Sequence, residues 1–107
     1  TARTAVDAFV AHADELGLPH GALVLSDEEL AMFGPHLARG DHAAFWDAGF
    51  PAIQVGDTGD FRNPYYHCTA GPDSPETLDY EFLTKVAQAT VGSVVTMTGL
   101  RPYRDGP

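Results

Sequence analysis

Helical and strand-like apolar patterns alternate along this 107-residue chain, and the alternation limits its possible folds more than any other feature. Apolar residues at helical spacing predict a helix over 3–17, and short apolar runs at 22–25 and 51–56 predict buried strands. This order predicts an α/β fold with at least some parallel strands. Because two strands are few for an independent sheet, we expect a piece of a larger sheet. A further strand from 57–66, or strand exchange between chains, is the alternative.

The remaining periodic segments also read as helices. Ser26, followed three residues later by Glu29, is the pattern of a capping box and predicts a short helix over 27–33. A second short helix is expected over 41–48. The last helix is expected to begin between residues 74 and 79 and to end near 95, and its wide apolar stripe predicts burial against a sheet.

Charge and composition exclude several classes of function. Fifteen acidic residues against six basic ones give a formal net charge of −9, without a Lys/Arg cluster. Nucleic acids and anionic membranes both require a positive surface, so we expect neither as a partner. The apolar stretches are shorter than the roughly 18 residues of a membrane span. One cysteine, Cys68, excludes an internal disulfide, and the length predicts a single domain over 1–107.

The segment 57–75 is rich in Gly, Pro, Asn and Asp and has no periodicity, which in a compact domain is typical of a functional or disordered loop. His67 lies within it, in the company of Asp57, Asp60 and Asp73. A neutral histidine ring is a good zinc ligand when a second group orients it. The alternative is an ordinary exposed loop histidine.

Four stretches together resemble a known enzyme family: residues 61–69, 73–80, 40–46 and 48–52. They are similar to the C-terminal part of the co-catalytic zinc exopeptidases, which include bacterial secreted aminopeptidases, glutamate carboxypeptidases and glutaminyl cyclases. The resemblance implies a three-layer fold with a central mixed sheet between helices. It also implies two zinc ions bridged by an aspartate and a water, a glutamate as general base and, by resemblance only, a secreted or periplasmic location.

The resemblance also implies roles for individual residues. His67 falls at the last metal-binding histidine, and Tyr66 at a tyrosine that stabilises the oxyanion, although packing on the loop is an equal alternative for Tyr66. Asp41 and Asp73 would be carboxylates behind the metal ligands, and Asp41 can equally act as a helix N-cap. Arg39 would contact the substrate's carbonyl or carboxylate, or is a surface charge.

The other metal ligands and the general base of this family would lie before residue 1. We therefore expect a zinc-dependent aminopeptidase-type hydrolase that removes N-terminal residues from peptides, represented here by a C-terminal segment that is inactive alone. Its expected partners are a peptide substrate and either an upstream segment of the same protein or a second copy. The alternative is a non-catalytic, peptidase-like interaction module that self-associates. A glutaminyl cyclase is a weaker expectation, because that branch favours a tryptophan where this chain has Tyr66.

Overall fold

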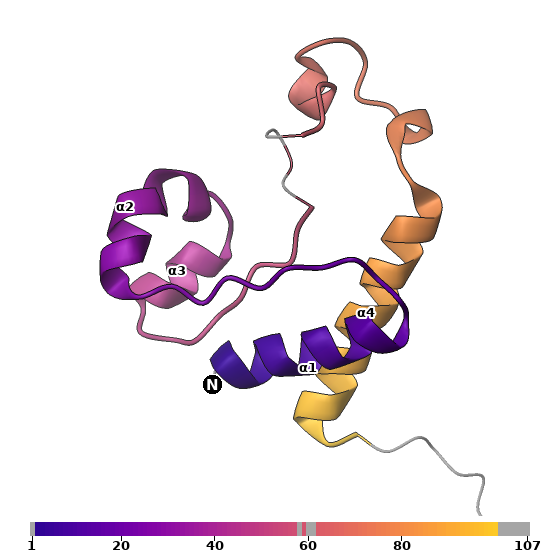
Figure 1. Cartoon of the computed structure of the whole chain (residues 1–107). Coiled ribbons are helices and arrows are strands. Elements are labelled where there is room, and N and C mark those ends of the chain that lie inside the picture. Colours follow the sequence, from indigo (N-terminus) through magenta and orange to yellow (C-terminus); the bar gives the residue numbers. More distant parts are fainter. Residues whose placement is uncertain (1, 58, 60–61, 101–107) are drawn as a thin grey trace, which may run out of the picture.

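The computed structural model describes residues 2–57, 59 and 62–100, and within these ranges every regular element is helical. Helices α1 and α4 pack against each other, whereas α2 and α3 lie together to one side of that pair (Figure 1). The short 3₁₀ turns η2 and η3 lie in the long connection from α3 to α4 (Figure 1). In chain order the elements are α1 (Ala2–Glu15), α2 (Asp27–Leu37), α3 (His42–Asp47), η2 (Tyr66–Cys68), η3 (Pro75–Thr77) and α4 (Tyr80–Thr98).

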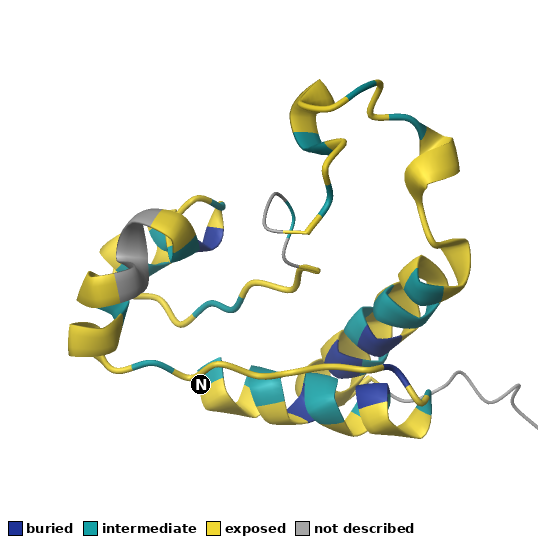
Figure 2. Ribbon diagram, turned by 45° about the horizontal axis from the view of Figure 1, so that its top comes forward, coloured by how far each residue is buried: buried dark blue, intermediate teal, exposed yellow. Residues whose placement is uncertain are grey.

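The core lies between α1 and α4. Ala13 and Ala89 are completely buried where the two helices meet, and Leu18 covers them from the segment after α1. Small side chains allow the two backbones to approach closely, and larger apolar residues flank the contact. The residues packed around it are Phe9, Leu16, Phe82 and Val86. Figure 2 shows that buried positions are few and concentrate on this helix pair.

Local chemistry explains where α1 and α4 end. Gly17 adopts a left-handed backbone (φ 60°), and the amides of Gly17 and Leu18 donate to the carbonyls of Asp14 and Ala13, the pattern of a Schellman motif. At α4, the Asp79 carboxylate accepts a hydrogen bond from the Phe82 amide at 2.9 Å. Gly99 is left-handed at the other end of α4. The predicted limits of both helices are therefore confirmed to within a few residues.

The predicted capping box at the start of α2 is also confirmed. The Ser26 amide donates to Glu29 Oε2 at 2.8 Å, and the Glu29 amide donates to Ser26 Oγ at 3.3 Å. The end of α2 was predicted too early, since the helix continues through residues 34 and 35 to Leu37. The φ that proline imposes is compatible with a helix, so Pro35 forfeits a hydrogen bond without necessarily ending the helix.

The predicted α/β fold with a mixed sheet is wrong: no strand occurs in the described ranges. Residues 22–25 and 51–56 lack regular secondary structure, and Leu23 and Val24 are 77% and 57% exposed. The physical reason is that a strand must pair its amides and carbonyls with a neighbour, whereas a helix satisfies them within its own segment. Neither apolar run has a pairing partner among the described residues, so the prediction of two buried strands is wrong.

Candidate functional site

The connection from α3 to α4 carries the predicted metal ligand, and its polar residues shape it locally. Asp57 Oδ2 accepts an ion-paired hydrogen bond from Arg62 at 3.0 Å, and its other oxygen accepts from the Gly59 amide at 3.3 Å. Asn63 Oδ1 accepts from the Tyr65 amide at 2.9 Å, the bond that defines an Asx turn. These contacts directly precede η2, which contains Tyr66 and His67.

His67 occupies an unusual backbone conformation. Its φ is 52° and its ψ is 33°, and the next residue, Cys68, has a φ of 62°. The left-handed region costs an L-residue about 1–2 kcal/mol. The His67 ring stacks face to face on the Tyr66 ring, with centroids 4.2 Å apart and planes 11° from parallel. His67 is exposed and Tyr66 is half-buried, so the imidazole lies at the surface, stacked on the tyrosine ring.

The described part of the chain does not complete a metal site around this imidazole. No group of three or more His, Cys, Asp or Glu side chains in residues 2–57, 59 and 62–100 is arranged to hold a metal ion. A zinc ion requires at least three protein ligands, and the two-zinc site of the resembled family requires more. The described residues alone therefore do not fit that site. Asp60, one of the carboxylates expected near His67, lies outside the described residues.

Two of the other predicted site residues lie in a different part of the fold from His67. Arg39 and Asp41 lie between α2 and α3, which both views place well away from η2 (Figures 1 and 2). Asp41 occupies the N-cap position of α3, but its side chain makes no capping hydrogen bond. Asp73 is exposed in the short stretch between η2 and η3. The structure thus stacks Tyr66 on His67 and places Arg39 and Asp41 in another part of the fold.

A different histidine, His42, is buried and hydrogen-bonded through one ring nitrogen. Its Nε2 donates to the Leu37 carbonyl at 2.6 Å, and its ring meets Trp46 edge-on at 4.5 Å. Gly40 leaves room for this ring, since a Cβ there would lie 2.8 Å from His42 Nδ1. Helix α3 is thereby joined to the end of α2.

A second polar cluster joins α1 to α4, and sequence reasoning did not find it. His12 Nε2 shares a hydrogen bond with Thr96 Oγ1 at 2.9 Å, and His12 Nδ1 lies 3.5 Å from Glu15 Oε2. Gly92 allows the ring to lie on the α4 backbone, because a Cβ there would be 2.8 Å from Nδ1. Eighty-four residues separate His12 from Thr96, so no local spacing could have revealed the contact.

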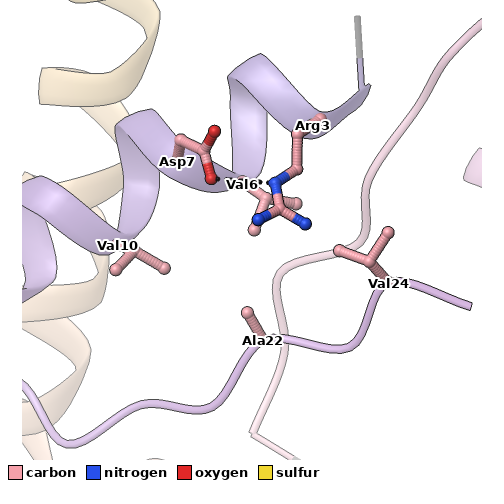
Figure 3. A pocket seen from close by; sticks show the side chains of 6 residues that line it. All are labelled: Arg3, Val6, Asp7, Val10, Ala22 and Val24. Carbon is pink, nitrogen blue, oxygen red and sulfur yellow. Dashed lines mark ion pairs between the residues drawn. The ribbon is translucent and has the colours of Figure 1, made fainter.

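A groove of about 440 Å³ opens between α1 and the extended segment after it (Figure 3). Arg3 and Asp7 form an ion pair of 3.2 Å at its side, and small apolar side chains line the rest. It contains none of the predicted site residues. The lining residues are Arg3, Val6, Asp7, Val10, Ala22 and Val24.

None of the helices in the described ranges combines the length and apolarity needed to cross a membrane.

Comparison with known proteins adds one longer relative. No model of a protein family matches the chain, and no solved structure matches it significantly. The chain is similar to the "Uncharacterized protein YfbL" of Escherichia coli (strain K12), with 27% identity over 77 residues. The match covers 65% of this chain and 23% of the E. coli protein. The chain therefore spans about a quarter of that relative's length, and the relative's name assigns no activity.

Proposed function

We propose that this chain is part of a zinc-dependent aminopeptidase-type hydrolase, in which His67 is one of the metal ligands. The resemblance of residues 61–69 and 40–46 to that family carries the proposal. The exposure of His67 supports it, because an exposed ring is accessible to a metal ion whose other ligands belong to a different part of a longer polypeptide. The buried His42, whose Nε2 already donates to a carbonyl, is a poor candidate for such a role.

Tyr66 is the second residue of the proposed site. Its ring stacks on His67, so the two side chains hold each other's orientation. A phenol fixed beside a reacting carbonyl would donate a hydrogen bond to the oxygen as negative charge develops there. Bound zinc would supply Lewis-acid polarisation and an activated water. Roles for Arg39, Asp41 and Asp73 in substrate binding or ligand orientation remain predictions.

The test uses the protein encoded by the complete open reading frame that contains these 107 residues. We expect it to hydrolyse an aminoacyl-p-nitroanilide, and we expect His67→Ala to lower kcat/KM by at least a hundredfold. His20→Ala is the matched control, because the half-buried His20 ring has local contacts, with the Leu18 carbonyl and near Asp14. Absence of hydrolysis, or equal loss in the two variants, would refute the proposal. The 107-residue chain alone is expected to be inactive.

The alternative is a non-catalytic, peptidase-like module that self-associates. The observation that favours it is the number of large apolar side chains exposed on α4 and on the segments 23–24 and 45–55. Sedimentation equilibrium on the 107-residue chain distinguishes the two proposals. A stable dimer, together with an inactive and zinc-free product of the complete reading frame, would favour the module.

A further inference from the structure

The outward face of α4 is largely apolar, and none of the other described elements covers it. Leu83, Ala87 and Val91 follow one another at four-residue spacing, and Val94 and Val95 continue the stripe. Leu83 is 49% exposed and Val91 is 63% exposed. The opposite face of the same helix packs on α1 through Phe82, Val86 and Ala89 and is already occupied. We call the stripe of Leu83, Ala87, Val91, Val94 and Val95 the outer face of α4.

The outer face of α4 contains no charged residue. The charged residues of α4, Glu81 and Lys85, lie toward the side of the helix by helical spacing and pair with each other at 3.1 Å. A surface helix normally places its polar residues opposite its packed face, whereas a helix that is apolar on both faces is typical of a buried position. The sequence of α4 is therefore that of a helix with neighbours on two sides.

The total solvent-exposed area of the chain, compared with that of a folded monomer of the same mass, indicates how much surface another region would cover. The chain exposes 8430 Å², whereas a folded monomer of 11.4 kDa exposes about 5,800 Å². The excess is about 2,600 Å². Even if the eleven residues outside the described ranges contributed as fully extended chain, they would account for about 1,700 Å² of it. The remainder, about 900 Å², exceeds the roughly 800 Å² that one partner contributes to a standard interface.

Further exposed apolar residues lie on other elements. Leu23 and Val24 are in the extended segment after α1, and Phe45 and Phe50 lie in and after α3. A two-fold dimer covers the same single patch on both copies, so one symmetric contact would leave several of these residues exposed. A second copy would also bring a charge of −9 against −9, which opposes self-association.

We propose that the outer face of α4 is an internal packing surface, covered by another region of the same polypeptide in a longer protein. The similarity to the E. coli protein supports this occupant, because the matched region is 23% of that protein and three quarters of its polypeptide lies elsewhere. The covering region presents an apolar layer to α4, with basic side chains at its margin that offset the acidic charge of this chain. The inference requires neither zinc binding nor peptide hydrolysis.

Two matched substitutions in α4 test the inference. Val91→Asp puts a charge on the outer face, and Gln88→Asp puts the same charge on an exposed position at the side of the same helix. In the protein encoded by the complete reading frame, Val91→Asp should lower the thermal midpoint by roughly 5 °C or more, because it buries an unpaired charge. Gln88→Asp should change it by no more than about 1 °C. In the 107-residue chain the two substitutions should change the thermal midpoint by the same amount.

Three outcomes would overturn the inference. The first is a reading frame that encodes no polypeptide beyond these 107 residues. The second is a longer protein in which Val91→Asp and Gln88→Asp have equal effects. The third is a 107-residue chain that sediments as a stable dimer and that Val91→Asp converts to a monomer, since a second copy would then be the occupant. An inactive or zinc-free longer protein would refute the proposed function and leave this inference standing.

Discussion

Replacing Gly92 by alanine tests the contact between α1 and α4 at its closest point. The added Cβ would lie 2.8 Å from Nδ1 of His12, 2.9 Å from Cγ and 3.0 Å from Cδ2. Because Cγ is fixed close to the His12 backbone, the ring can move away only by rotating about χ1. That rotation breaks the 2.9 Å hydrogen bond to Thr96. Without this contact, alanine would stabilise a helix relative to glycine.

The magnitudes decide the sign of the effect. Alanine in place of glycine gains about 1 kcal/mol of helix propensity. The lost hydrogen bond and the crowding together cost roughly 2–3 kcal/mol. We therefore expect Gly92→Ala to lower the free energy of opening α4 by about 1–2 kcal/mol. Amide hydrogen exchange in α4 should then be about 5- to 30-fold faster.

A double-mutant cycle separates the contact from the propensity. In a His12→Ala background the ring is absent, so Gly92→Ala should slow exchange in α4 by the propensity gain of about 1 kcal/mol. The coupling energy between the two positions should be about 2–3 kcal/mol. If Gly92→Ala stabilises α4 while His12 is present, or if the coupling is below about 0.5 kcal/mol, the described packing of His12 on Gly92 is wrong.

Three other substitutions test the local structure. Gly40→Ser should shift the ring resonances of His42 and destabilise α3 by roughly 1–3 kcal/mol, because the new Cβ would lie 2.8 Å from His42 Nδ1; NMR measures both. Asp79→Ala removes the side chain that caps the Phe82 amide and should destabilise α4 by about 1 kcal/mol, which amide hydrogen exchange measures. Hydrogen bonds from the Ser26 amide and hydroxyl lower the pKa of Glu29, so the capping box should stabilise α2 above the ordinary glutamate pKa of about 4.3. That contribution should be lost as pH falls through the lowered value. Glu29→Gln should flatten this acid transition in circular dichroism, and an unchanged transition would contradict the assignment.

The helices could be predicted because their signals are local. The apolar spacing of α1, the stop at Gly17 and the capping box at Ser26 all act within a few residues, so the sequence alone contains them. The same holds for the cap at Asp79. The end of α2 was missed because a glycine–proline pair lowers helix propensity without forbidding the helix.

The strands could not be decided from the sequence in the same way. A short apolar run such as 22–25 can become a strand only when a neighbour pairs with it, and the run itself does not specify that neighbour. The apolar stripe of α4 posed a related problem. Phe82, Val86 and Ala89 pack on helix α1, whereas Leu83 and Val91 are exposed, so the prediction of a helix buried against a sheet was wrong.

The candidate site was predicted mainly from the resemblance to a known enzyme family and less from the spacing of its residues. Tyr66 and His67 are adjacent in sequence, so their stacking is local. Asp41 would have to reach His67 through tertiary structure, and the structure places the segment between α2 and α3 well away from η2. The contact of His12 with Thr96 is also tertiary, between helices at opposite ends of the chain, and no periodicity predicts it.

Zinc stoichiometry in the protein encoded by the complete reading frame is the most direct test of the proposed role of His67. Metal content per polypeptide should be measured by plasma mass spectrometry after dialysis, for the native protein, His67→Ala and His20→Ala. We expect about two zinc ions in the native protein and in His20→Ala, the number that a two-metal hydrolytic site requires. His67→Ala should retain one or none. A native protein without zinc, or a His67→Ala variant with the full amount, would contradict the account.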